Sequence, residues 1–174
     1  MRVLVSPQEC DLEIEEFCRQ AHGRLVGALA HHFGDVGLAE ELANEALVRV
    51  WERWSRVSRL ESPEGWAYRV GVNLGRSRLR RRRAEVRARE RLPRPAGTPP
   101  PDDFAIVAEA LGLLGDRDRQ VILLRHYFGL SSSEAGAILG VSANNVRVIA
   151  HRALSRLKAD LAIDDPLEEA KHVT

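Results

Sequence analysis

A segment of twelve residues, L-P-R-P-A-G-T-P-P-P-D-D at positions 92–103, sets the first limit on the fold. Its five prolines lack the backbone N–H that a helix needs and clash with the preceding turn, so no helix continues through it. Segments of this composition form extended, semi-rigid linkers. The chain is therefore expected to contain two modules, residues 11–91 and 104–161, followed by an acidic tail at 162–174.

Charge is distributed unevenly along the chain, although the net charge of the 174 residues is only +1. Between Arg76 and Arg94, ten arginines stand against two glutamates, so this stretch carries +8 and the remainder −7. A basic block on an otherwise acidic chain indicates a localised contact with a polyanion. An arginine run is also compatible with a solvated or targeting segment, but its place at the end of a helix favours nucleic acid.

Other features restrict the class of protein. No stretch reaches the ~18 apolar residues of a membrane helix and the N-terminus lacks a secretory signal, so we expect a cytoplasmic protein without membrane insertion. Cys10, Cys18 and His22 are candidate zinc ligands without an evident fourth, which favours a buried apolar cysteine and no metal. The sequence lacks a Gly-rich phosphate loop, a nucleophile elbow and a paired-histidine motif, so we expect no cofactor and no enzymatic activity.

The first module is predicted to begin with an amphipathic helix over residues 11–33. Its apolar side chains recur at helical spacing, and Gly34 ends the run. His31 and His32 fall in the last turns and face different directions, which disfavours a joint role as ligands. We expect both histidines to be exposed to solvent.

The second predicted helix begins at the N-cap Asp35 and has two contrasting faces. An apolar face comprises Ala39, Leu42, Ala43, Ala46, Leu47, Val50, Trp51 and Trp54. The opposite face comprises Glu40, Glu41, Asn44, Glu45, Val48 and Glu52. Glu45 can pair with Arg49 one turn later. The acidic face is either a solvated surface or a binding surface for a basic protein partner.

The third predicted helix starts with Ser62 as N-cap and Pro63 in the first turn, and it continues into R-S-R-L-R-R-R-R. Trp66, Tyr68 and Asn73 precede the arginines. Aromatic rings stack on bases, amides hydrogen-bond to base edges, and guanidinium groups neutralise phosphates. This combination predicts a contact with nucleic acid.

Helices are predicted throughout the second module. A first helix lies within residues 104–114, and Asp116 is expected to cap the next, which ends at Gly129. Ser131 and Glu134 have the spacing of a capping box, which predicts a short helix after them.

The last predicted helix, residues 142–161, completes a helix-turn-helix. Ser142 is a suitable N-cap after a turn at Gly140. The apolar stripe of this helix comprises Val146, Ile149, Ala150, Ala153, Leu154, Leu157 and Leu161. Most of its polar side chains lie off that stripe: Asn144, Asn145, Arg147, His151 and Arg152. Such a helix docks one side on a core and offers its N-terminal end to a DNA groove.

In their order and spacing, these motifs resemble a bacterial RNA polymerase sigma factor of the extracytoplasmic-function (ECF) group of the sigma-70 family. L-A-E-E-L-A-N-E-A-L-V-R-V-W is similar to region 2.2, which docks on the coiled coil of the polymerase β′ subunit. P-E-G-W-A-Y-R-V-G-V-N-L-G-R-S-R-L-R-R-R-R resembles regions 2.3 and 2.4, which melt and read the promoter −10 element. L-L-G-D-R-D-R-Q-V-I-L-L-R-H-Y-F-G-L-S-S-S-E-A-G-A-I-L-G-V-S resembles region 4, whose final helix reads the −35 element. The resemblance implies an all-α fold with two small helical domains, sigma region 2 and sigma region 4, joined by the proline-rich linker.

The resemblance also implies which residues act. It places the polymerase contact on Glu40, Glu41, Leu42, Asn44, Glu45 and Val48. It places promoter contacts on Trp66, Tyr68, Asn73, Arg76, Arg78, Arg80 and Arg81, and on Ser142, Asn144, Asn145, Arg147, Val148, His151 and Arg152. Asn44 replaces the usual glutamine, Ser77 a common aspartate, and Asn144-Asn145 a frequent Gly-Thr pair. Promoter preference is therefore expected to depart from the family's norm.

The implied function is promoter-specific transcription initiation with core RNA polymerase, through contacts with its β′ and β subunits. An anti-sigma factor, which often holds members of this group inactive, is an optional further partner. The alternative is a stand-alone helix-turn-helix regulator that binds duplex DNA unaided, but it leaves the acidic second helix and the arginine-tipped third helix without a role. The tail at 162–174 is either disordered or a shield for the basic surfaces.

Overall fold

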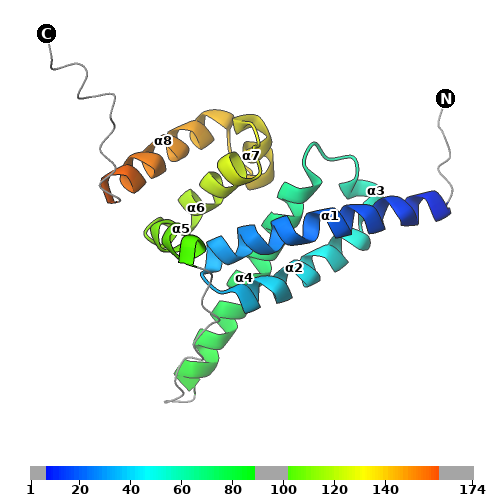
Figure 1. Cartoon of the computed structure of the whole chain (residues 1–174), viewed down its shortest axis with the longest axis horizontal. Coiled ribbons are helices and arrows are strands. Elements are labelled where there is room, and N and C mark those ends of the chain that lie inside the picture. The colour runs from blue at the N-terminus through cyan, green and yellow to red at the C-terminus, as the bar shows by residue number, and fades with distance from the viewer. Residues whose placement is uncertain (1–6, 89–101, 161–174) are drawn as a thin grey trace, which may run out of the picture.

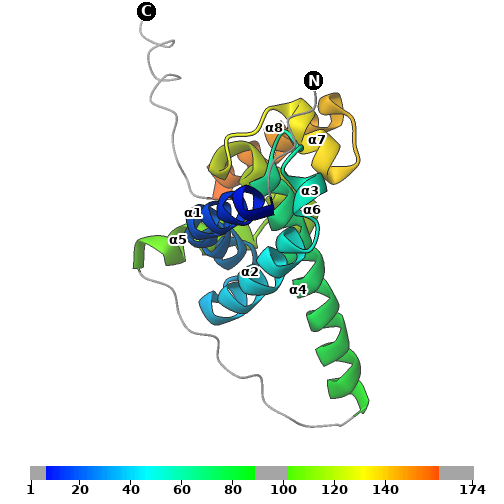
Figure 2. The same ribbon diagram turned by 90° about the vertical axis from the view of Figure 1, so that its right-hand side faces the viewer.

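The structure is a computed structural model that describes residues 7–88 and 102–160. Within these ranges the chain forms helices and no β-strand (Figures 1 and 2). The helices are α1 (Pro7–Phe33), α2 (Val36–Trp51), α3 (Trp54–Val57), α4 (Pro63–Ala88), α5 (Asp102–Gly112), α6 (Asp116–Ile122), the π-helical turn η1 (Leu123–Tyr127), α7 (Ser132–Leu139) and α8 (Ala143–Asp160). The predicted all-α fold is confirmed. None of the described helices has the length and apolar character needed to cross a bilayer.

Side-chain caps mark where α2 and α4 of the first module begin. The Asp35 carboxylate accepts a hydrogen bond from the Leu38 amide at 2.9 Å, which caps α2 directly after Gly34 in the left-handed conformation (φ 70°). The Ser62 hydroxyl accepts from the Gly65 amide at 3.1 Å at the start of α4. Both caps were predicted from the sequence and are confirmed, because capping depends on residues three positions apart.

The first module packs α1, α2 and α4 around buried aliphatic side chains, among them Leu29, Leu42 and Val72. A glycine allows α4 to approach α1 closely, because a Cβ atom on Gly71 would lie 2.8 Å from Leu29 Cδ1. The close packing holds the start of α4 in place, while its arginine-rich end projects away from the other helices (Figure 2).

The second module contains the predicted helix-turn-helix in α7 and α8. Ser131 and Glu134 form the predicted capping box, with an amide-to-hydroxyl distance of 3.2 Å and an amide-to-carboxylate distance of 2.7 Å. Gly140 ends α7 in the left-handed conformation (φ 70°). The Ser142 hydroxyl then accepts from the Asn145 amide at 3.2 Å, which caps α8. The turn fixes α8 relative to α7.

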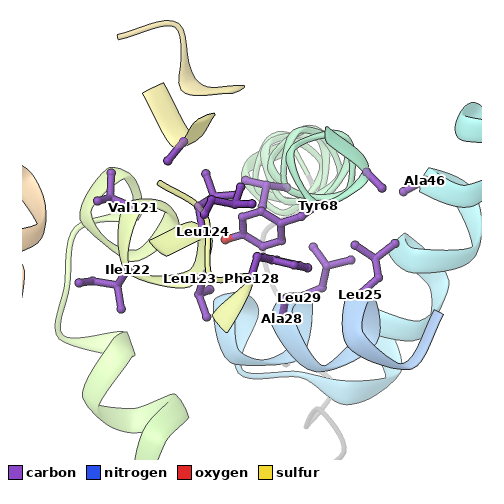
Figure 3. Close-up of a cluster of buried hydrophobic side chains, with 14 of the residues drawn as sticks. Leu25, Ala28, Leu29, Ala46, Tyr68, Val121, Ile122, Leu123, Leu124 and Phe128 are labelled. Carbon is purple, nitrogen blue, oxygen red and sulfur yellow. The ribbon is translucent and has the colours of Figure 1, made fainter. Parts of the chain in front are cut away.

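The two modules pack against each other and share one hydrophobic core (Figure 3). The ring of Tyr68 from α4 lies 5.4 Å from that of Phe128, centroid to centroid. Leu29 from α1 and Leu124 from η1 lie beside this pair. The sequence predicted two modules on a tether and did not predict that they dock.

Both histidines at the end of α1 lie in the contact between modules. His32 is fully buried, with Nδ1 2.9 Å from the Tyr68 hydroxyl and Nε2 2.9 Å from Asp116 Oδ1. This geometry fits a neutral ring that donates from Nε2 and accepts at Nδ1. His31 is half-buried and stacks on Phe104 at 3.8 Å. The expected exposure of both side chains was wrong, because the groups that cover them are distant in sequence.

Burial of His32 predicts that the protein becomes less stable in mild acid. The pKa of His32 is lowered to about 3, mainly by burial and further by the positive charges of Arg119 and Arg76. An unfolded histidine titrates near pH 6.5, so below that pH the unfolded chain takes up a proton that the folded chain does not. The free energy of unfolding should be highest above pH 6.5 and should fall toward pH 5 with a slope approaching ~1.4 kcal/mol per pH unit.

Urea unfolding at a series of pH values measures this slope. The variant His32→Gln removes the titrating group, so its stability should change much less between pH 6.5 and 5. The same slope in the variant and the wild type would show that another group is responsible.

Some helix boundaries differ from the prediction. α1 begins at Pro7 rather than at residue 11, and α5 begins at Asp102, inside the segment predicted as a linker. The N-cap of α6 is Gly115 rather than Asp116, which is the first residue of the helix, and the Asp116 carboxylate accepts from His32 and does not cap the helix. The end of the basic block and the tail at 162–174 lie outside the described residues.

Candidate protein and nucleic-acid interfaces

The exposed side of α2, called the α2 face here, comprises Glu40, Glu41, Asn44, Glu45 and Val48. All are exposed except Glu45, which is partly buried, and Val48 is an apolar side chain with 57% of its surface exposed. Asn44 Oδ1 lies 3.1 Å from His22 Nε2 of α1. An apolar side chain framed by acids suits a protein partner with a basic, amphipathic surface.

Leu42 does not belong to this surface. Its side chain is fully buried in the core between α1, α2 and α4. One residue along a helix turns the side chain by about 100°, so Leu42 points inward although Glu41 points outward. The predicted contact between Leu42 and a partner protein was wrong.

Trp51 extends the α2 face by almost one turn beyond Val48. It was predicted on the apolar face, but 47% of its surface is exposed. Helix α2 ends at this residue, and Phe17 of α1 packs on Trp54 instead, at 5.1 Å between ring centroids. Trp51 follows Val48 by three residues, and this helical spacing was the signal that would have placed Trp51 on the exposed side.

Arg78 of α4 links the α2 face to the arginine-rich helix. Its two terminal nitrogens donate to Glu41 Oε2 at 2.6 Å and to Glu45 Oε2 at 2.8 Å. Arg49 donates to the other oxygen of Glu45 at 3.0 Å, which confirms the predicted pair on α2. The hydrogen bonds from Arg49 and then Arg78 outweigh partial burial and lower the pKa of Glu45. Glu45 therefore stays ionised.

A polar cavity of about 660 Å³ lies between α2 and α4. It is lined by Glu45, Arg49, Arg53, Val70, Asn73, Leu74, Ser77, Arg78 and Arg81. Most of its charged groups are guanidinium groups, and Asn73 is exposed among them. Arg49 Nε is buried with no hydrogen-bond partner among the described residues. The cavity offers cations for phosphates and an amide for a base edge.

Sequence reasoning missed two of the cavity's arginines. Arg49 was assigned only to the pair with Glu45, and Arg53 was not assigned a role. Both lie near the end of α2, and α4 brings Asn73 and Ser77 opposite them. The sequence shows a single basic block on the third helix, so arginines contributed by another helix could be found only from the structure.

The other predicted DNA contacts of α4 fall into different environments. Tyr68 is fully buried, so the prediction that its ring stacks on a base was wrong. Trp66 is partly buried against the core. Arg76 forms an ion pair with Asp116 of the second module. Arg80 and Arg81 are exposed on α4 beyond the core.

Helix α8 has one buried and one exposed side, as predicted. Its described core contacts are Val146, Ile149 and Ala153. Its predicted DNA contacts, together with the preceding cap, are all exposed: Ser142, Asn144, Asn145, Arg147, Val148, His151 and Arg152. Leu154 was placed on the apolar stripe, but it is 38% exposed. An α-helix with such an exposed polar row fits the width of the DNA major groove.

Both modules match known sequence families. The family model described as Sigma-70 region 2 matches residues 18–85, and that described as Sigma-70, region 4 matches residues 104–157. The RNA polymerase sigma-E factor of Streptomyces avermitilis is 32% identical over 157 residues, which cover 88% of this chain and 88% of that protein. The ECF RNA polymerase sigma factor ShbA of Streptomyces griseus is 31% identical over 82% of this chain and 78% of that protein.

Solved structures have the same fold. The sigma factor RpoE of Bartonella quintana, in complex with the anti-sigma factor NepR, aligns with a TM-score of 0.76 at 21% identity, over 88% of this chain and 99% of that one. CnrH, in complex with the cytosolic domain of CnrY, aligns with a TM-score of 0.61 at 27% identity, over 87% and 89% of the two chains. Both alignments include most of the two modules.

Proposed function

The chain belongs to the ECF group of the sigma-70 family of RNA polymerase sigma factors, and on this premise we propose how its surfaces divide the work of promoter recognition. As a sigma factor it acts with core RNA polymerase and directs initiation at specific promoters. This division is supported by one observation: α8 and the cavity between α2 and α4 are separate exposed surfaces. The polar row of α8 suits duplex DNA, whereas the cavity suits a separated single strand.

We assign the α2 face to the polymerase β′ subunit. Glu40, Glu41, Asn44 and Val48 present acids and an amide around an apolar side chain, and Trp51 adds a second apolar group. Aromatic residues contribute strongly to the binding energy of protein interfaces, whereas charged residues set the orientation of the two proteins and the choice of partner. The same acids repel DNA phosphates, which keeps this face available for protein.

We assign the cavity to the strand that separates at the −10 element. Reading a base outside the duplex requires a pocket with a hydrogen-bonding group for the base edge and cations for the adjoining phosphates. Asn73 supplies the amide, and Arg81 supplies a cation on the same helix. Arg80 extends the cationic surface along α4, and Trp66 lies near the start of that helix.

We assign α8 to duplex DNA at the −35 element. Ser142, Asn144 and Asn145 lie at the start of the helix, which is the end that reaches base edges in helix-turn-helix proteins. Arg147 and Arg152 follow on the exposed side, where they neutralise phosphates or read guanines. We expect Asn144 and Asn145 to set a sequence preference that differs from the family's norm.

This assignment implies a regulatory subunit without catalytic activity of its own, working in the cytoplasm, where RNA polymerase acts. A stand-alone regulator is not favoured, because the first module also matches a sigma-factor region. An anti-sigma factor is a further proposed partner, since both solved relatives are complexes with such proteins or with a partner domain.

Asn73→Ala tests the assignment of the cavity. Losing one base contact costs ~1–3 kcal/mol, so strand opening by the reconstituted polymerase should fall about tenfold or more. Permanganate reactivity of unpaired thymines measures the opening, and upstream binding should stay within about twofold of the wild type. Ser77→Ala changes the same cavity without removing an amide and serves as the matched control. Equal strand opening by Asn73→Ala and the wild type would remove Asn73 from the assignment.

A further inference from the structure

The end of α2 contributes two arginines to the cavity, and the proposed function gives neither of them a role. Glu45, Arg49 and Arg53 follow one another at four-residue steps, so they lie on one side of α2 and of the turn after it. This side faces the cavity. Val48 and Trp51 lie on the α2 face instead, where both are exposed. One helix thus presents apolar and acidic groups on one surface and arginines on another.

The facing wall of the cavity comes from α4, and its side chains share one stripe of that helix. They recur at three- and four-residue steps: Val70, Asn73, Leu74, Ser77, Arg78 and Arg81. Val70 and Leu74 provide apolar surface for the flat face of a base, and Asn73 provides an amide for its edge. Helices α2 and α4 run in opposite directions (Figure 1), so the end of α2 lies toward the Val70 end of this stripe. Arg81 lies at the other end of the stripe.

The arginines of the cavity differ in how far their guanidinium groups are already occupied. Both terminal nitrogens of Arg78 donate to carboxylates, at 2.6 Å to Glu41 and at 2.8 Å to Glu45. Arg53 and Arg81 are exposed, and neither has a side-chain hydrogen bond or ion pair with another described residue. Arg78 therefore braces α2 against α4, whereas Arg53 and Arg81 keep their donors available for a ligand.

The guanidinium group of Arg49 is only partly occupied. One terminal nitrogen donates to Glu45 Oε1 at 3.0 Å, while Nε is buried without a partner among the described residues. A buried donor without an acceptor costs free energy. The side chain is still 40% exposed, so a modest rotation of the guanidinium turns Nε toward an acceptor in the cavity. An anionic oxygen suits it, because the four arginines and one glutamate of the cavity give a net charge of +3.

This layout matches one nucleotide of an unpaired strand together with the phosphates on either side of it. Asn73 lies three residues after Val70 and eight before Arg81, or ~5 Å and ~12 Å along α4. The arginines of α2 and Arg81 therefore lie on opposite sides of the amide. Each base within a strand is flanked by two phosphates, and guanidinium groups bind phosphate oxygens through charge-assisted hydrogen bonds.

We propose that Arg49 and Arg53 form a phosphate subsite, which holds the backbone phosphate on one side of the base that Asn73 reads, while Arg81 holds the phosphate on the other side. The proposal rests on the proposed function, because it takes the cavity as the site of the separated −10 strand. It adds that α2 serves both partners, since the α2 face binds polymerase and the arginines at the end of the helix bind DNA. A phosphate contact carries no sequence information, so the subsite holds the strand in register whatever the base.

Binding of the reconstituted polymerase to a promoter fragment with an unpaired −10 segment tests the subsite, because strand opening is then bypassed. Arg53→Ala should lower the affinity about three- to tenfold, by a similar factor for every base at the read position. The plot of log affinity against log salt concentration should become shallower by about 0.7, the value for one phosphate contact with a single strand. Arg56→Ala is the matched control, because Arg56 is exposed but does not line the cavity, so both quantities should stay at wild-type values. An unchanged salt slope in Arg53→Ala would overturn the proposal.

Methylphosphonate linkages, each of which removes the charge of a single phosphate, locate the contact within the strand. With the wild type, one neutral linkage beside the read base should weaken binding about as much as Arg53→Ala does. Combining that linkage with Arg53→Ala should cause little further loss, because both changes remove the same interaction. Losses that multiply at every linkage tested would show that Arg53 contacts no phosphate of this strand, and the subsite would be wrong.

Arg49→Ala tests the second arginine in the same way, with circular dichroism to show that loss of the pair with Glu45 leaves the helices intact. If this variant unfolds, Arg53→Ala alone decides. Affinity for core polymerase should stay within about twofold of the wild type in both variants. Failure of the proposed function is separate, because Asn73→Ala would then bind the unpaired fragment as tightly as the wild type. A loss in Asn73→Ala with none in Arg53→Ala would keep the −10 assignment and remove the subsite.

Discussion

Replacing Arg147 and Arg152 together with glutamate should reduce promoter binding by the reconstituted polymerase about a hundredfold or more. Each arginine contact with a base or phosphate contributes ~1–3 kcal/mol, and the reversed charges add repulsion. Both side chains lie on the exposed side of α8, whereas Val146 and Ile149 hold its other side in the core. The double variant should therefore keep its fold and lose a DNA surface.

Electrophoretic mobility shifts with a cognate promoter fragment would measure the loss at fixed salt concentration, since every charge contact depends on salt. Arg156→Glu is the control, because Arg156 is exposed one turn beyond Arg152 on α8 and its guanidinium lies 4.0 Å from the Asp118 carboxylate. Its effect should stay below about threefold, because charge contacts far from the groove are screened by salt. A free-energy loss in Arg156→Glu that is half that of the double variant, in proportion to the charge changed, would mean that only net charge matters, and the assignment of α8 as a reader would be wrong.

Replacing Glu40 and Glu41 together with lysine should weaken binding to core polymerase about thirtyfold or more. Like charges placed across a protein interface cost several kcal/mol, and each 1.4 kcal/mol is a factor of ten in affinity. Both acids are exposed on the α2 face. Glu41 also accepts from Arg78, so its replacement frees that arginine and adds to the positive charge of the surface.

Fluorescence anisotropy of labelled chain titrated with core polymerase would give the affinity. Glu13→Lys on α1 is the control, since Glu13 is exposed but does not belong to the α2 face. Circular dichroism should show the same helix content in both variants. If the double variant binds core polymerase as tightly as Glu13→Lys, the α2 face is not the polymerase contact.

Local features of the fold were predicted correctly from the sequence. The caps at Asp35, Ser62 and Ser142 and the capping box at Ser131 depend on side chains within three residues of the amides they bind. Helical periodicity likewise placed Val146 and its neighbours in the core and the polar row of α8 outside it. Local spacing determines these features, so a single sequence contains the information.

Features that depend on contacts between distant segments were not predicted. Tyr68 shares a helix with Asn73, and only the packing of η1 and α1 against α4 shows that the tyrosine is covered. His32 and Asp116 are far apart in sequence. The proline-rich segment suggested that the two modules act independently, so no contact between these two residues was expected. Arg49 and Arg53 joined the candidate site only when α2 and α4 were placed side by side.

Footprinting of the reconstituted polymerase on one cognate promoter tests the division of labour between the modules most directly. The wild type should protect an upstream and a downstream segment and make downstream thymines reactive to permanganate. Asn73→Ala should keep the upstream protection and lose most of the reactivity, whereas the double variant at Arg147 and Arg152 should lose the upstream protection first. If both variants lose both signals equally, or if the chain protects both segments without polymerase, the two modules do not read separate promoter elements within the polymerase complex.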